Sequence, residues 1–217
     1  MTDGADQQER RTERDRSYHH GNLVAALIDA TIEIVREKGI EQVSVREAAR
    51  RAGVSPGAPF RHFENKAALM LAIAEQAVSL LDAAFDETLA ATENLSAIDR
   101  IETRGHAYLE WAYRYPIHLQ ILWTPFVVDA SGSQFIADRS VKMIERGEAL
   151  FAQAQRDGDI AQNLDIELVA FASRTQLYGL ARMLTDGDFY RAELKADPLG
   201  AMKRAYSLHV GQLRAGA

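Results

Sequence analysis

The sequence contains no cysteine, only five prolines and no long apolar run. Without cysteine the chain cannot form disulfides, bind zinc through thiolates or use a cysteine nucleophile. A membrane-spanning helix needs roughly 18 consecutive apolar residues, and no uninterrupted stretch approaches that length. Residues 1–16 lack the apolar segment that a secretory signal peptide contains. We therefore expect a cytoplasmic protein that has no membrane partner.

Spacings typical of catalytic and metal sites are also missing. His19 and His20 are neighbours in sequence, so they cannot share a helical face as metal ligands spaced by four residues do. The sequence contains neither a glycine-rich nucleotide loop nor a Gly-x-Ser-x-Gly elbow. Asp157 and Asp159 begin like a calcium loop, but Leu168 stands where that loop requires glutamate. These absences favour a protein that is not an enzyme and that needs no metal or cofactor.

Positive charge is concentrated in one short segment of an acidic chain. Overall, 25 lysines and arginines face 31 aspartates and glutamates, which leaves a net charge of −6. Residues 42–66 reverse this balance, because their basic residues outnumber the two acidic ones. The basic residues are Arg46, Arg50, Arg51, Arg61 and Lys66. Phosphate contacts depend on local charge, so this segment is suited to a polyanion.

The periodicity of the apolar residues predicts an all-α protein of about nine helices. From Leu23 onward, apolar residues recur at spacings of three and four, which places them on one face of successive helices. Ser44 and Glu47 form a capping box, and Asn65 is suited to cap a long helix. The expected helices cover residues 23–38, 45–52, one or two turns after Ser55-Pro56, 66–91, 97–115, 117–123, 134–156, 165–185 and 198–214.

The first three of these helices have the arrangement of a helix-turn-helix. Helices 23–38 and 45–52 precede a tight Gly-Val-Ser turn and a short third helix, as in a three-helix DNA-reading head. Gly53 supplies the positive φ that such a corner needs. Pro59 would occupy the fourth position of the third helix, where it removes a backbone amide. We therefore expect a tight or distorted first turn there.

The segment from Tyr18 to Leu69 resembles the TetR family of bacterial transcription regulators. The matching motifs are Tyr18-His19-His20-Gly21-Asn22-Leu23, Val43-Ser44-Val45-Arg46, Ala49-x-x-Ala52-Gly53-Val54-Ser55, Phe60-Arg61-His62-Phe63, Asn65-Lys66 and Leu69. The resemblance implies an N-terminal helix-turn-helix domain and a larger helical C-terminal domain that dimerises and encloses an effector pocket. We accordingly expect a disordered tail at 1–16, a DNA-binding domain at 17–66 and an effector-binding and dimerisation domain at 67–217.

Ten residues of the basic segment are expected to contact DNA. They are Ser44, Arg46, Ser55, Pro56, Gly57, Ala58, Phe60, Arg61, His62 and Lys66. The resemblance implies phosphate contacts for His62 and Lys66, and Lys66 also begins a helix whose amides suit a phosphate. Phe60 stands where the family commonly has tyrosine, so it cannot donate a phenolic hydrogen bond.

The expected recognition of bases is unusually sparse. Gly57 and Ala58 carry almost no hydrogen-bonding side chain, so direct readout through them is thin. Specificity should therefore depend on Arg46, Arg61 and the shape of the DNA.

An aromatic cluster in the C-terminal half is the second candidate site. Tyr115-Pro116 interrupts the helical pattern, and both tryptophans lie near that break. Apolar walls with a few hydrogen-bonding groups are typical of small-molecule pockets, although core packing is the simpler explanation for any single aromatic residue. Residues 174–179 are similar to the Trp-x-x-x-His-Gly signature of one TetR subgroup, with arginine and tyrosine replacing tryptophan and histidine. The expected pocket residues are Tyr108, Trp111, Tyr115, His118, Trp123, Phe126, Phe171 and Tyr178.

These patterns predict a homodimeric, ligand-responsive transcription regulator. We expect a repressor that an unknown small-molecule effector releases from a palindromic double-stranded DNA operator. Apolar stripes on the last two long helices are suited to a four-helix dimer interface. These stripes are Leu168, Ala172, Leu180 and Leu184, and Leu199, Met202, Tyr206, Val210 and Leu213.

Two other functions are compatible with parts of the sequence. The alternative is an architectural or protein-partnered DNA-binding factor without a small ligand, which would have a filled core near Trp111 and Trp123. An all-helical enzyme is least favoured, because no catalytic spacing is present.

Overall fold

The computed structural model describes residues 23–124, 133–187 and 192–215. Within these ranges the chain is helical and has no strand beyond an isolated bridge between Ile160 and Arg214, so the predicted all-α class is confirmed. The chain forms two compact units. The first takes in the chain up to Ile73, and the second comprises Ala74–Trp123 and the chain from Ser131.

The N-terminal unit consists of short helices around a small apolar core. Residues 23–38 form a helix that ends at Gly39, whose φ of 84° favours glycine. Two 3-10 turns, η1 (Ile40–Gln42) and η2 (Pro59–Arg61), flank α2 (Val45–Arg51), and the long helix α3 (Lys66–Ala91) follows. The buried side chains of this unit include Leu27, Ile34, Val45, Phe63, Leu69 and Met70.

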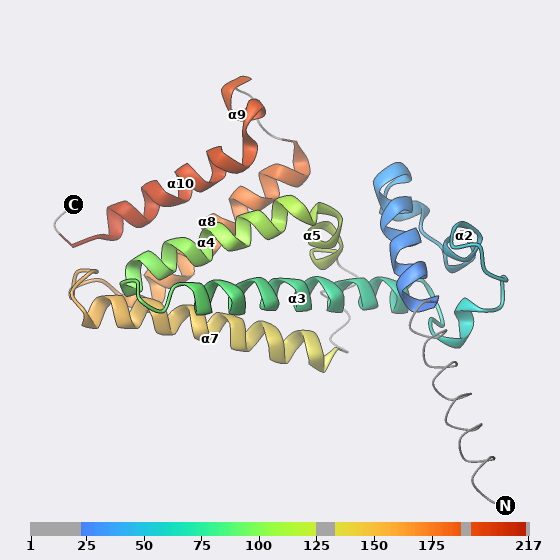
Figure 1. The fold of residues 1–217 in the computed structure, drawn as a ribbon, viewed down its shortest axis with the longest axis horizontal. Helices are drawn as coiled ribbons and strands as arrows, with labels where there is room; N and C mark the ends of the chain where they lie inside the picture. The colour runs from blue at the N-terminus through green and yellow to red at the C-terminus, as the bar shows by residue number, and fades with distance from the viewer. Residues whose placement is uncertain (1–22, 125–132, 188–191, 216–217) are drawn as a thin grey trace, which may run out of the picture. The chain divides into compact units, whose positions relative to one another are not determined.

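The C-terminal unit packs its helices around α4. After α3, its helices are α4 (Ala97–Arg114), α5 (Pro116–Leu122), α7 (Gln134–Arg156), α8 (Ile166–Asp186), α9 (Ala192–Ala196) and α10 (Pro198–Leu213). Helix α4 contacts α7, α8 and α10, which can be followed in Figure 1. One core cluster joins buried residues of these four helices, among them Leu109, Phe151 and Tyr206.

Side-chain caps account for the N-terminal ends of most of the described helices. Ser96 and Asp165 each accept a hydrogen bond from the backbone amide three residues later, which begins α4 and α8 as predicted. Asn65 caps α3 in the same way, with 2.9 Å between its Oδ1 and the amide of Ala68. Gly187 follows α8 with a φ of 71°. Helix α9 was not predicted, because its five residues are too few to show a helical period.

Helix α3 is apolar over most of its length. By length and composition alone it could cross a membrane, although it contains charged residues and so lacks an uninterrupted apolar run. Several of its apolar side chains, among them Met70, Ile73 and Ala77, are fully buried inside the protein. We therefore interpret α3 as a core helix.

Candidate DNA interface and ligand cavity

The predicted helix-turn-helix corner is present in the N-terminal unit. The Oγ of Ser44 accepts a hydrogen bond from the amide of Glu47 at 3.2 Å, which begins α2. After α2, Gly53 has a φ of 69°, and the position of its missing Cβ has no atom within 4 Å. Backbone conformation, and not lack of space, therefore favours glycine here. The amide of Val54 closes the turn by donating to the carbonyl of Ala49 at 3.0 Å.

The segment after the corner is shorter than the helix that the sequence predicted. Residues 55–58 form turns, and η2 is a single 3-10 turn. Pro59 has no amide hydrogen with which to continue an α-helical ladder. The amide of Ala58 donates instead to the carbonyl of Ser55 at 3.0 Å, and the amide of His62 to that of Pro59 at 2.9 Å. A 3-10 turn thus replaces the expected one- or two-turn helix, for the reason that Pro59 indicated.

The basic residues of this unit divide into paired and unpaired groups. Arg50 forms two hydrogen bonds with Glu47, at 2.7 and 2.8 Å, and Arg51 pairs with Glu37 at 2.5 Å. Hydrogen bonds from Arg50 and Lys38 lower the pKa of Glu47 to about 2. These arginines are therefore partly neutralised by nearby carboxylates.

Arg46 and Arg61 form the unpaired group. Both are exposed, and neither has a carboxylate within ion-pair distance among the residues that the structure describes. Among the arginines of residues 42–66, these are the two whose guanidinium groups need not leave a protein partner to bind a phosphate or a base.

Lys66 has a structural contact that the sequence did not indicate. Its Nζ donates to the carbonyl of Ile40 at 2.8 Å and to that of Glu41 at 3.2 Å, which ties the start of α3 to η1. An ammonium group has three donors, so one remains for the predicted phosphate contact. His62, also predicted to contact a phosphate, is half-buried with its ring 6.5 Å from that of Phe63.

The remaining predicted contact residues lie mostly on the surface of the same unit. Ser55, Pro56 and Gly57 are exposed, and Ala58 is half-buried. Phe60 is 49% exposed, so its ring is available for apolar contact and not committed to the core.

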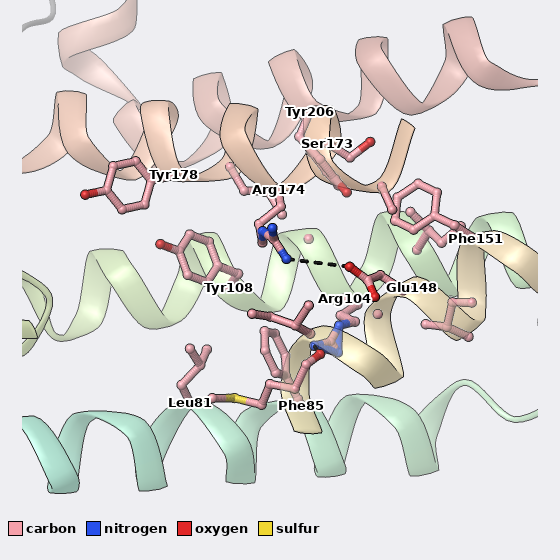
Figure 2. Close-up of a pocket in the computed structure, with 18 of the residues that line it drawn as sticks. Leu81, Phe85, Arg104, Tyr108, Glu148, Phe151, Ser173, Arg174, Tyr178 and Tyr206 are labelled. Atoms are coloured by element: carbon pink, nitrogen blue, oxygen red, sulfur yellow. Dashed lines mark hydrogen bonds and ion pairs between the residues drawn. The ribbon is translucent and has the colours of Figure 1, made fainter. Parts of the chain in front are cut away.

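The C-terminal unit contains a partly open cavity of about 420 Å³. Helices α3, α4, α5, α7, α8 and α10 all contribute side chains to its wall, which is mainly apolar. Figure 2 shows Leu81 and Phe85 from α3, Tyr108 from α4 and Phe151 from α7 around this space. Burial raises the pKa values of two lining tyrosines, Tyr108 and Tyr206, so both hydroxyls remain protonated donors. The volume lies in the range of small-molecule sites, about 300–1,000 Å³.

Two arginines interrupt the apolar wall. Arg174 lies 3.8 Å from Glu148, the ion pair drawn as a dashed line in Figure 2. Arg104 stacks over Phe85, with its Cζ 3.8 Å from the ring centre, and donates from Nη2 to the carbonyl of Met143 at 2.7 Å. Burial lowers the pKa of Arg104 to about 10, so the group is still cationic at neutral pH.

The expected pocket residues are distributed over several environments. Tyr108 and Tyr178 line the cavity. Trp111 is buried in a neighbouring core cluster, and Tyr115 and Trp123 pack against that cluster. His118 is buried with Nε2 3.1 Å from Oε1 of Gln76, and Phe171 is exposed on α8. Phe126 lies outside the described residues.

Several lining residues had no sequence signal. Arg104 and Tyr206 come from α4 and α10, and only the packing of these helices brings them together. Gly105 marks this approach, because a Cβ built there would lie 1.9 Å from the ring of Tyr206. A glycine inside an otherwise regular helix is the one feature that could have indicated such a contact.

Comparison with known proteins identifies the family. Residues 27–73, which contain the corner and the start of α3, match the family model described as bacterial regulatory proteins, tetR family. The HTH-type transcriptional regulator BetI of Rhizobium meliloti is 26% identical over 181 residues, which cover 80% of this chain and 79% of that protein. Together these matches support a TetR-family transcriptional regulator, with residues 27–73 as its family domain.

Other comparisons extend the likeness of this TetR-family chain. The HTH-type transcriptional repressor KstR of Mycobacterium tuberculosis is 27% identical over 134 residues, and the chain spans 58% of its length. A TetR-family regulatory protein from Rhodococcus RHA1 has the same fold, with a TM-score of 0.68, 21% identity and coverage of 90% of this chain and 98% of that one. The family establishes the general function as DNA-binding transcriptional regulation.

Proposed function

We propose that this TetR-family regulator is a cytoplasmic, homodimeric repressor that releases a palindromic operator when a small molecule occupies its cavity. The cavity of about 420 Å³ carries this proposal, because its volume and mainly apolar wall are typical of small-molecule sites. It also favours a ligand-responsive regulator over the alternative of a DNA-binding factor without a small ligand. Enzymatic activity is no part of the proposal.

The DNA contacts are proposed for the residues predicted from the sequence. Arg46 and Arg61 are the strongest candidates, because they are exposed and unpaired in the described part of the chain. Phe60 and Pro56 offer apolar surface suited to thymine methyl groups. In a two-fold dimer, two such corners would bind two half-sites of a palindrome.

The dimer is proposed to form through α8 and α10, but without three of the side chains predicted on α10. Met202, Tyr206 and Val210 are buried within the core of their own chain, so they are not available to a partner. Leu168 and Phe171 on α8 are 62% and 51% exposed, and Leu208 on α10 is 66% exposed. Exposed apolar side chains on two helices in contact are typical of a protein interface.

Selection of bound duplexes from a random DNA pool tests the proposal. We expect enrichment of a palindromic site, and a titration of that site with the purified protein should show binding of a dimer. A subsequent screen should find compounds that weaken operator binding by about 5- to 150-fold, the usual range of allosteric coupling. Failure to enrich any duplex at low ionic strength would contradict the DNA-binding role. Enrichment without any releasing compound would favour the ligand-free alternative.

A further inference from the structure

A second pocket adjoins the apolar cavity and shares part of its wall. The two have Phe85, Arg104 and Leu150 in common. The second pocket has a volume of about 280 Å³ and lies among α3, α4 and α7. Among its described lining residues, four are arginines and one, Asp86, carries a carboxylate. The arginines are Arg100, Arg104, Arg146 and Arg156. An apolar space therefore opens beside a strongly basic one.

Arg104 lies where the two pockets meet. One of its nitrogens donates to the Met143 carbonyl, and no carboxylate lies within ion-pair distance in the ranges that the structure covers. A guanidinium group has five N–H donors, so most of those of Arg104 remain for a ligand. A charged group taken out of water without a charged partner is unfavourable, and an anion at this point would offset that cost.

The other arginines add to the positive charge of the second pocket. The Nε of Arg100 is buried and has no hydrogen-bond partner within the described chain. Arg146 lies 2.8 Å from Asp86 and 3.7 Å from Asp82, but Asp82 is also bound by Arg139. The nearby carboxylates are thus already shared among arginines, and Arg100 and Arg104 have no ion-pair partner there.

We propose that the effector is an anionic amphiphile whose apolar part fills the larger cavity and whose carboxylate or phosphate head binds Arg104 and Arg100 in the basic pocket. This inference rests on the proposed ligand response and specifies the chemical class of the ligand. The apolar wall of the larger cavity is suited to the tail of the ligand. Arg104 lines both pockets, so it lies where the tail would meet the anionic head group. Because the basic pocket holds an excess of cations, a cationic ligand would be repelled and a neutral one would leave the arginines unsatisfied.

Four compounds with the same tail and different heads test this class directly. Dodecanoate, dodecyl phosphate, dodecanol and dodecyltrimethylammonium would be titrated into the purified full-length protein by calorimetry, each below its micelle-forming concentration. We expect the better anion to bind about 10- to 100-fold more tightly than dodecanol, as is usual for hydrogen bonds between charged groups. The ratio of dodecanoate to dodecyl phosphate affinity identifies which head the pocket prefers.

Substitutions of individual arginines test where the anionic head group of the ligand binds. Arg104→Gln and Arg100→Gln should each reduce the preference for anions over dodecanol, and leave dodecanol affinity within about twofold. Arg174→Gln removes the other arginine of the apolar cavity, and Arg204→Gln removes an exposed arginine of α10 outside both pockets. Both of these variants should retain the preference. If Arg104→Gln does not fold, Arg100→Gln and the four compounds on the unaltered protein still decide the question.

The outcomes separate the two proposals. Equal affinity for dodecanol and the anions, tightest binding of dodecyltrimethylammonium, no binding of any dodecyl compound, or loss of the preference in Arg174→Gln would each overturn the anionic head site. An anion that binds through Arg104 but does not release the selected operator would support this site and contradict the proposed release mechanism. Release by unrelated compounds, with no dodecyl compound bound, would support the proposed function and overturn this inference.

Discussion

Replacement of Gly105 by alanine tests the contact between α4 and α10 that forms one wall of the cavity. A Cβ at this position would lie 1.9, 2.5 and 2.6 Å from three ring atoms of Tyr206. The shortest of these separations is about 1.5 Å below the 3.4 Å at which ordinary contact begins. Tyr206 is only 2% exposed and packs in the core cluster of α4, α7, α8 and α10, so a shift of its ring disturbs that packing.

The expected effect combines two opposing terms. Overpacking of a dense core typically costs about 1–3 kcal/mol, and a shift of this size in a buried ring places Gly105→Ala in the upper part of that range. Alanine in place of glycine inside a helix stabilises the folded state by about 1 kcal/mol. We expect a net loss of about 1–2 kcal/mol in the free energy of unfolding. In a chain of this length, that lowers the melting temperature by about 2–8 °C.

Gly147→Ala is the matched control. Gly147 also lies within a helix and lines the same cavity, but its Cβ would meet Arg104 at 3.7–3.8 Å, an ordinary contact. This variant should keep the helix gain of about 1 kcal/mol and melt about 2–4 °C above the unaltered protein. Thermal unfolding followed by circular dichroism, at equal protein concentrations, measures the melting temperatures of both variants. A Gly105→Ala protein that melts at or above Gly147→Ala would refute the packing argument.

Three further predictions concern DNA binding, assembly and pH. Arg61→Ala and Lys66→Ala should each reduce the slope of log affinity against log salt by about one unit in fluorescence titrations. Only Lys66→Ala should also lower the melting temperature, because the Nζ of Lys66 donates hydrogen bonds to two backbone carbonyls. Equal melting temperatures of the two variants would contradict this structural role of Lys66. Leu168→Glu should shift the protein from dimer to monomer in light scattering, and an unchanged mass would exclude this part of α8 from the interface. Burial lowers the pKa of His209, so the unfolded chain binds its proton more readily, and stability should fall as pH decreases below about 6.5. Urea unfolding at about pH 7.5 and about pH 5.5 should show that His209→Gln reduces this pH dependence, and an unchanged dependence would assign it to other groups.

Much of the fold was predictable because helix ends depend on residues close in sequence. Ser96 and Asp165 act on amides three residues away, and Gly53 acts through its own φ. The tight turn at Pro59 was also predictable, since the missing amide belongs to that residue. Each of these features can be predicted from residues that are close together in the sequence.

The site was less predictable because its contacts join distant segments. Lys66 reaches the carbonyl of Ile40, and the approach of Tyr206 to Gly105 depends on how α10 packs on α4. The aromatic composition near Tyr115 indicated a pocket, but Trp111 is buried in a neighbouring cluster. Composition indicates that large apolar side chains will be buried, whereas only three-dimensional packing decides which of them border an empty volume.

The 3-10 turn at Pro59 has a consequence for how the operators of this regulator evolve. If residues 56–59 face the operator as proposed, their proline, glycine and alanine side chains would lose little binding energy when one base pair is exchanged, because few hydrogen bonds would depend on that pair. Related promoters should therefore accumulate substitutions within their operators while groove width and flexibility are maintained. The operators of this protein would then resemble one another less in base sequence than in the mechanical properties of the duplex.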